Sequence, residues 1–394
     1  CNFNVNPLLD RGLAGIRPRS ECVVGIESVE ENRVKNQSSQ SASAVRPGVG
    51  SEPGAAASET RSLRDRWSRP LADLRISVTD LCNFRCRYCM PKEVFGSDFV
   101  FLPRSEILTF EEIHRLARVF HGFGVRKFRL TGGEPLLRAD LPVLIEMLAA
   151  LPESEVALTT NGALLAQQAE ALAAAGLGRV TVSLDAVDDE LFHRFNDVRF
   201  PVEDVLHGLD TAAAAGLAPI KVNSVIKKGV NDGHLVQLAE HFKGSQVILR
   251  FIEYMDVGTT NGWRMDDVLP AGEMVERLQA IHPMEPIEPN HPGEVAKRWR
   301  YRDGGGEIGF ITSVTQPFCG DCSRARLSAD GRLFTCLFAA EGFDVREHLR
   351  NGSSDEALAG HVSAVWTRRR DRYSELRTLE TSKQSRVEMS YIGG

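Results

Sequence analysis

Short apolar runs rich in β-branched residues alternate with apolar stripes of helical period between residues 74 and 253. We predict strands over 74–78, 127–131, 155–160, 179–185, 219–226 and 246–253, with helices between them over 110–122, 139–151, 163–175, 202–215 and 233–243. Such alternation predicts a parallel sheet wrapped by helices. Because these strands are fewer than the eight of a closed (β/α)8 barrel, the predicted fold class is α/β, an open, partial TIM-like (β/α)6 barrel.

The pattern changes after residue 256, where strand-like runs follow one another without helices between them. The predicted elements are strands over 297–302 and 307–314, a hairpin over 324–336 and a helix over 354–370. In the hairpin, Asp330-Gly331 would supply the positive φ angles of a tight turn. The basic end of the helix, Arg368-Arg369-Arg370, suits the negative end of its dipole. We therefore predict a barrel over 63–256, closed by a β-rich and helical region over 257–394.

The first 62 residues show no sustained apolar period and are rich in Ser, Gly, Ala and Arg. That composition predicts a disordered extension. A cleaved transit segment is the alternative, since such segments are rich in Arg and Ser. Four glutamates spoil its acid-poor signature, namely Glu21, Glu27, Glu30 and Glu31.

Composition excludes several broad classes of function. The chain has 394 residues, 42% hydrophobic and 25% charged, as in globular proteins. Its net charge of −6 does not suit a nucleic-acid binder, so an anionic ligand must be met by local cations. No apolar run approaches the roughly 20 residues of a membrane-spanning helix. The eight cysteines are clustered in a metal pattern, which indicates a reducing compartment. We expect the cytoplasm, or an organelle if the first 60 residues are a transit segment.

Cys82, Cys86 and Cys89 form a C-x3-C-x2-C motif just after the first predicted strand. The loop brings three thiolates around one centre and supplies no fourth ligand nearby. A structural zinc site requires four ligands, whereas a [4Fe–4S] cluster held by three thiolates keeps one iron open for chemistry. The motif therefore predicts such a cluster, with buried or zinc-bound cysteines as the alternative.

Cys319, Cys322 and Cys336 form a second triplet, C-x2-C-x13-C. A zinc site here would need a distant fourth ligand, because no histidine lies within the motif and the next one downstream is His348. A second three-cysteine [4Fe–4S] cluster, with its open iron facing a ligand, fits better.

Cations lie on the predicted strands, where parallel sheets are normally apolar on both faces. They are Arg75, Lys127, Arg129, Lys221 and Arg250. Alternation along a strand can point such side chains into the barrel, although salt bridges are the alternative explanation. Arg324 and Arg326 alternate onto one face of the hairpin. Arginine binds phosphate well because its donors form a planar fork. The set would suit an anionic ligand, and the sequence has no P-loop motif.

The first triplet and its neighbour Tyr88 resemble the radical S-adenosylmethionine enzymes. Both triplets, together with the final Gly393-Gly394, resemble the family of GTP 3′,8-cyclases of molybdenum-cofactor biosynthesis over residues 67–394. Leu81 departs from that family, which often has arginine there. The resemblance implies two [4Fe–4S] clusters, S-adenosylmethionine, GTP and an electron donor of unknown identity. It also implies a 5′-deoxyadenosyl radical that takes the C3′ hydrogen of GTP, after which C3′ bonds to C8.

Site residues follow from the same resemblance. The six cysteines would bind the clusters, and Tyr88, Gly133, Ser183 and Met255 would bind S-adenosylmethionine. The GTP set would be Arg75, Lys127, Arg129, Thr160, Lys221, Arg324, Ala325 and Arg326. The catalytic set would be Arg75, Arg129, Arg250, Gly393 and Gly394. Two alternatives remain open: a peptide-modifying radical enzyme with an auxiliary cluster, and a non-catalytic iron–sulfur or zinc scaffold. A homodimer is compatible with these expectations.

Overall fold

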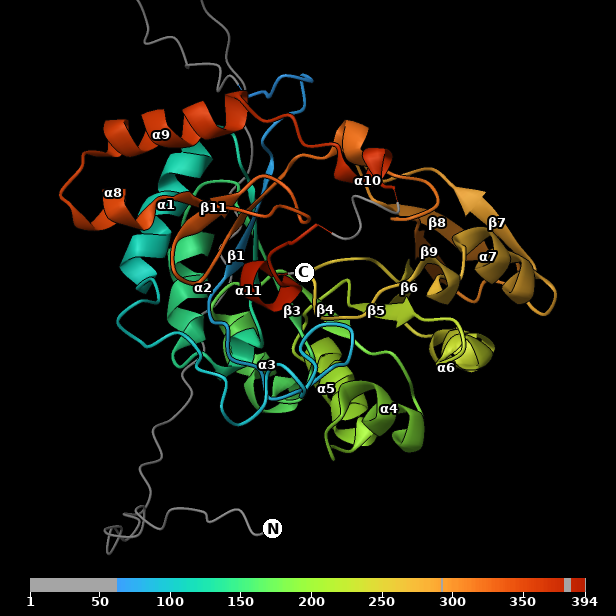
Figure 1. Cartoon of the computed structure of the whole chain (residues 1–394). Helices are drawn as coiled ribbons and strands as arrows, with labels where there is room; N and C mark the ends of the chain where they lie inside the picture. The colour runs from blue at the N-terminus through green and yellow to red at the C-terminus, as the bar shows by residue number, and fades with distance from the viewer. Residues whose placement is uncertain (1–61, 292, 379–383, 394) are drawn as a thin grey trace, which may run out of the picture. The chain divides into compact units, whose positions relative to one another are not determined.

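The computed structural model describes residues 62–291, 293–378 and 384–393, all within one compact unit. The predictions for the N-terminal extension and for Gly394 fall outside these residues. Within them, one sheet runs in the strand order β12-β11-β10-β1-β2-β3-β4-β5-β6-β9-β8-β7 (Figure 1). Its central strands are β1 (Asp73–Ser77), β2 (Lys127–Thr131), β3 (Glu155–Thr160), β4 (Arg179–Ser183), β5 (Lys221–Ile226) and β6 (Ile248–Glu253).

The six central strands are parallel, as predicted. Helices connect them: α1 (Phe110–Gly122), α2 (Leu141–Ala149), α3 (Leu165–Ala174), α4 (Asp189–Asn196), α5 (Val202–Ala214) and α6 (Leu235–Phe242). In β1 the side chains alternate, so that Leu74 and Ile76 are fully buried in the core between sheet and helices. The next helix, α1, begins at a capping box formed by Thr109 and Glu112. The predicted α/β partial barrel is confirmed.

The C-terminal region extends the parallel sheet on both sides. Its strands are β7 (Met284–Ile287), β8 (Ala296–Tyr301), β9 (Glu307–Ile311), β10 (Arg324–Leu327), β11 (Arg332–Phe334) and β12 (Phe343–Asp344). β10 pairs in parallel with β1, and β9 pairs in parallel with β6. The predicted strand pairs β8–β9 and β10–β11 are antiparallel. The sheet therefore continues across the expected boundary at residue 256.

The remaining helices are α7 (Ala271–Gln279), α8 (Arg346–Arg350), α9 (Asp355–Thr367), α10 (Tyr373–Leu376) and α11 (Met389–Ile392). The sequence prediction did not include α4, α7, α8, α10, α11, β7 or β12. In the β10–β11 hairpin only Gly331 has a positive φ, of 83°, so the same prediction for Asp330 is wrong. Across the described ranges, no helix has the length and apolar character needed to cross a membrane.

Candidate active site

The first cysteine triplet lies in the loop that follows β1, and backbone hydrogen bonds hold this loop in place. Gly133 N donates to Thr79 O at 2.8 Å, and Glu134 N donates to Leu81 O at 2.7 Å. A Cβ added to Gly133 would lie 2.2 Å from Leu81 O, and one added to Gly132 would lie 2.5 Å from Thr79 O. Glycine is therefore required here by the cysteine loop itself.

The three thiols of this loop interact with one another. Burial raises the pKa of Cys82 to about 11, and it raises the pKa values of Cys86 and Cys89 further, to which their mutual proximity contributes. Phe84 N donates to the Cys82 sulfur at 3.4 Å. Thiols held this way need a positive partner to ionise, and a bound metal is such a partner.

The second triplet lies where the chain enters β10 and leaves β11. Arg369 Nη1 donates to Cys322 O at 2.6 Å, and Arg369 Nη2 donates to the Cys322 sulfur at 3.2 Å. Although burial alone would raise it, the guanidiniums of Arg324 and Arg369 lower the pKa of Cys322 to about 6. The explanation of Arg369 as a helix-dipole cation is therefore incomplete, because its side chain is buried against this triplet.

Both triplets line one cavity of about 280 Å³, where about 10–15 Å³ would hold one water molecule. Cys82 follows the end of β1, whereas Cys322 precedes the start of its parallel neighbour β10. The two sulfur groups thus lie toward opposite ends of these strands. β1 has five residues, so the strand between these two ends is itself roughly 16 Å long at about 3.3 Å per residue.

The donor set fits iron–sulfur clusters better than single ions. Within the described residues, no three His, Cys, Asp or Glu side chains converge closely enough to hold one metal ion. A four-iron cube is larger than one ion and spaces its thiolates farther apart. Three buried thiols on the wall of one cavity suit such a cluster, with an iron left open toward the cavity.

Arginines cover the cavity wall between the two triplets. Arg75, Arg129, Arg250, Arg324 and Arg326 all line it. Strand pairing places several of these arginines side by side in a row. Arg75 of β1 lies opposite both Arg326 of β10 and Arg129 of β2. The Nε atoms of Arg75, Arg250 and Arg326 are buried and have no hydrogen-bond partner among the described residues.

Burial and mutual repulsion disfavour these charges in the free protein. Burial lowers the pKa of Arg250 to about 9, helped by Arg129, and lowers the pKa of Arg326 to about 10, helped by Arg324. The pKa of Arg75 is lowered well below its usual value by burial first and Arg326 second. An anionic ligand would relieve both effects, so the cavity is built for one.

Of the other predicted GTP residues, only Thr160 lines the cavity. Lys127 and Lys221 begin β2 and β5 and do not line the cavity. Lys127 faces Asp73 instead, with 3.9 Å between Nζ and Oδ2. Ala325 is fully buried in the core. Thr160 lines the cavity, but its hydroxyl donates to Glu134 Oε1 at 2.7 Å.

The predicted S-adenosylmethionine residues meet beside the first triplet. Tyr88, Gly133, Ser183 and Met255 all line the cavity. The Tyr88 hydroxyl donates to Asp185 Oδ2 at 3.0 Å, and Val225 N donates to Asp185 Oδ1 at 2.7 Å. Burial raises the pKa of Asp185 to about 7.

Three residues outside the predicted site set support this wall. Asp185 holds the Tyr88 hydroxyl, and Glu134 accepts from Thr160, Asn161 N and Leu136 N. Gly309 of β9 lies opposite Arg250, and a Cβ there would come within 3.0 Å of Arg250 Cγ. The signal for the two acids was their place at the polar ends of strands. Gly309 gave none, because its importance comes from strand pairing.

The C-terminal segment reaches the cavity wall, with α11 beside β1 (Figure 1). Met389 and Ser390 line the cavity, and Ile392 is fully buried. Gly393 has φ of 72°, and a Cβ there would lie 2.2 Å from Thr131 Cγ2. A side chain at this position would therefore clash with the end of β2.

Comparisons with known proteins agree with this geometry. The family described as Radical SAM superfamily matches residues 76–242, and Molybdenum Cofactor Synthesis C matches residues 247–375. The GTP 3′,8-cyclase of Acidothermus cellulolyticus is 55% identical over 361 residues, covering 85% of this chain and 100% of that protein. The GTP 3′,8-cyclase of Staphylococcus aureus (strain MRSA252) is 49% identical over 337 residues, covering 84% of this chain and 99% of that protein.

A solved structure of Streptococcus suis SuiB bound to S-adenosylmethionine matches with a TM-score of 0.54 at 15% identity, covering 75% of this chain and 68% of that one. At that identity the likeness shows the fold alone. The fold and the family match define a radical S-adenosylmethionine enzyme with an iron–sulfur cluster. Within this class, the identities above place the chain in the GTP 3′,8-cyclase family. The peptide-modifying alternative is not favoured.

Proposed function

We propose that the chain converts GTP into (8S)-3′,8-cyclo-7,8-dihydroguanosine 5′-triphosphate, the first step of molybdenum-cofactor biosynthesis. The named relatives support this reaction. The observation that carries it is the row of buried arginines, because the Nε atoms of Arg75, Arg250 and Arg326 have no hydrogen-bond partner within the described residues. Buried donors are normally satisfied. A triphosphate would satisfy all three and neutralise their charges.

The arginine row would bind and orient GTP. Guanidinium groups form charge-assisted, paired hydrogen bonds with phosphate oxygens. Arg129 already donates to Thr159 Oγ1 at 3.2 Å, which fixes its direction before GTP binds. Arg75, Arg129 and Arg250 are the proposed catalytic arginines. By holding GTP in one orientation they would present a single C–H bond of the sugar for reaction.

Six cysteines would hold two [4Fe–4S] clusters, the first by Cys82, Cys86 and Cys89 and the second by Cys319, Cys322 and Cys336. When bound, the first cluster supplies the electron that splits S-adenosylmethionine. Tyr88, Gly133, Ser183 and Met255 would line the pocket of that molecule, with Asp185 holding the Tyr88 ring. The second triplet lies at the other end of the arginine row and would serve the substrate.

The C-terminal segment would close the site. The side chain of Ile392 is fully buried, Met389 and Ser390 line the cavity, and Gly393 packs on Thr131. Excluding water protects a radical from side reactions. Gly393 and Gly394 are therefore proposed as part of the catalytic set, together with the three arginines.

Anaerobic turnover tests this function directly. The reconstituted enzyme is incubated with S-adenosylmethionine, dithionite and GTP, ATP, CTP or UTP in turn, and 5′-deoxyadenosine and cyclised nucleotide are measured. We expect both products in equal amounts with GTP, and no cyclised product with the other nucleotides or without dithionite. S-adenosylmethionine cleavage that yields no cyclised GTP would overturn the proposal.

The cellular compartment, the oligomeric state and the electron donor remain predictions. We propose a reducing, cytoplasmic compartment, supported by six cysteines that are free of disulfides. A homodimer and an electron donor of unknown identity are proposals as well. Sedimentation of the reconstituted enzyme tests the homodimer. Replacement of dithionite by reduced flavodoxin or ferredoxin tests the electron donor.

A further inference from the structure

A buried carboxylate outside the arginine row joins the end of the chain to the cavity wall. Asp256 is 2% exposed and directly follows Met255. It accepts hydrogen bonds from Arg377 Nε at 3.0 Å, Arg386 Nη1 at 3.1 Å and the Tyr373 hydroxyl at 2.5 Å. All three donors come from the last 22 residues of the chain. One buried acid thus gathers two arginines and a tyrosine from the C-terminal segment.

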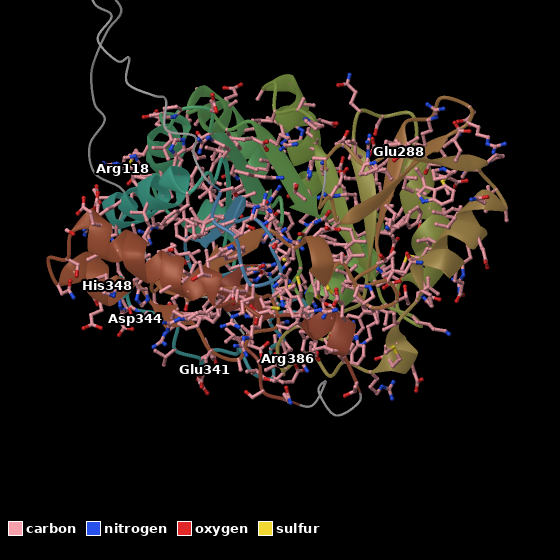
Figure 2. The ribbon with its side chains drawn as sticks, turned by 90° about the horizontal axis from the view of Figure 1, so that it is seen from above. Arg118, Glu288, Glu341, Asp344, His348 and Arg386 are labelled. Carbon is pink, nitrogen blue, oxygen red and sulfur yellow. The ribbon has the colours of Figure 1, made fainter. Side chains whose placement is uncertain are left out.

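Aromatic packing supports the same junction. The Arg386 guanidinium lies 4.7 Å from the centre of the Tyr373 ring, and the Arg377 guanidinium lies 5.3 Å from the Phe338 ring. Tyr373 and Phe338 stack at 4.6 Å. Cations over aromatic faces gain further when they are desolvated. In Figure 2, Arg386 is labelled at the lower side of the molecule, between His348 and Glu288 across the view.

A second carboxylate fastens the segment two residues after Arg386. Glu388 Oε1 accepts from Thr259 N at 2.8 Å and from Thr259 Oγ1 at 3.0 Å, while Oε2 accepts from Thr260 Oγ1 at 2.9 Å. A Cβ on Gly258 would lie 2.1 Å from Glu388 Oε2, so this turn leaves the space that the carboxylate fills. Such a turn of backbone and hydroxyl donors is a small anion site.

The loop 255–260 is therefore shared by two parts of the active site. At its start, Met255 lines the cavity beside the first cysteine triplet. At Asp256, Thr259 and Thr260 it holds the segment that continues into α11 and Gly393. Asn261 Nδ2 donates to Met255 O at 3.2 Å and to Val257 O at 2.9 Å, which ties the loop to itself.

We propose that Asp256 and Glu388 are positioning residues that fasten the C-terminal segment 386–393 to the loop 255–260, so that the same contacts set Gly393 against Thr131 and Met255 in the cavity wall. Neither carboxylate lines the cavity. They act through the residues that they hold. The effect on turnover rests on the proposed function, whereas the fastening does not.

The test compares Glu388→Gln and Asp256→Asn with the wild-type enzyme and with a matched control, Glu341→Gln. Glu341 is an exposed glutamate, labelled in Figure 2, and it makes no hydrogen bond or ion pair with the described residues of the segment. Trypsin cleavage after Arg386 reports release of the segment without any need for turnover. We expect cleavage to be about tenfold faster in both variants, the change that corresponds to about 1.4 kcal/mol, and unchanged in Glu341→Gln.

Turnover supplies a second measurement, the ratio of products, which would not change if the two carboxylates had a purely structural role. We expect the yield of cyclised GTP per 5′-deoxyadenosine to fall about tenfold in Glu388→Gln. We also expect KM for S-adenosylmethionine to rise, with iron content and thermal midpoint close to wild type. If Asp256→Asn fails to fold, Glu388→Gln still decides. Wild-type protection from trypsin, or a wild-type product ratio with a released segment, would overturn the inference. Absence of cyclised GTP from the wild-type enzyme would overturn only the proposed function.

Discussion

A charged side chain on a parallel strand is unusual because both faces of such a strand are normally apolar. This rule predicts inward-facing Arg75, Arg129 and Arg250, and all three line the cavity. It predicts the same for Lys127 and Lys221, which the structure places outside the cavity wall. The difference depends on strand stagger and on which end of a strand faces the cavity. Alternation along one strand carries no information about either.

Arg75→Ala should weaken GTP binding by about 1.5–3 kcal/mol, because a charge-assisted hydrogen bond is lost. Lys221→Ala should weaken it much less, since that lysine acts only through longer-range charge, and the loss should shrink further at high salt. Calorimetry without reductant measures both, with S-adenosylmethionine as the internal control. Equal losses of GTP affinity in the two variants would contradict the assigned cavity wall.

Lysine burial also makes stability depend on pH. The pKa of Lys221 is lowered from 10.5 to about 8 by burial first and by Arg250 second. Between about pH 8 and pH 10.5 the unfolded chain binds more protons than the native one, so this group makes stability rise with pH. Urea unfolding at pH 7.5 and 9.5, without GTP, should show a change in stability that is less positive in Lys221→Met than in the wild type. An identical change in the two proteins would rule out the Lys221 contribution.

The residues outside the predicted site set act through partners that are distant in the sequence. Glu134 meets Thr160, Asp256 meets Arg377, and Gly309 makes room for Arg250. In each case the chemistry arises only after two strands or loops have come together. Cysteine triplets differ from these residues because their spacing alone reports a shared ligand, and for that reason they were found.

At the scale of elements, alternation predicts β1 to β6 and their order because each strand and its helix are neighbours in the chain. It does not predict that β9 and β10 continue the same sheet in parallel on its two sides. That arrangement is set by pairing between residues far apart in sequence. α4 carried a readable signal, an Asp188 cap followed by Leu191, Phe192 and Phe195, but its short length concealed it.

The placement of the triplets at opposite ends of β1 and β10 predicts separable losses. Cys82→Ser should abolish reductive cleavage of S-adenosylmethionine, because the electron enters at that end. Cys319→Ser should retain much of that cleavage, without GTP turnover, because the other end serves the substrate. Each variant should lower the iron content from about eight to about four per chain.

Anaerobic iron analysis and 5′-deoxyadenosine assays measure these outcomes. Normal GTP turnover by Cys319→Ser would show that the second triplet has no role in the reaction. Zinc in place of iron at the second triplet of the wild-type enzyme would show that only one cluster is present.

At the scale of the described unit, we propose that the site is complete only when the end of the chain packs against the end of β2. The first triplet, the arginine row and the second triplet come from strands and their loops, whereas Ile392 and Gly393 arrive from the last helix. A terminal Gly-Gly suggests a close approach of backbone to something crowded. What it approaches, the Thr131 side chain at the end of β2, appears only in the fold.

Gly393→Ala should therefore remove cyclisation while sparing the clusters. Its Cβ would lie 2.2 Å from Thr131 Cγ2, and its φ of 72° also disfavours a side chain. Gly352→Ala is the matched control, because Gly352 has φ of 80° but open space around its added Cβ. We expect cyclised GTP to fall about tenfold or more in Gly393→Ala, with iron content, thermal midpoint and 5′-deoxyadenosine formation near those of the control.

Deleting Gly393 and Gly394 should have the same effect, and a short peptide ending in Gly-Gly should restore part of the activity. Full turnover by either variant would mean that the end of the chain has no role in the reaction.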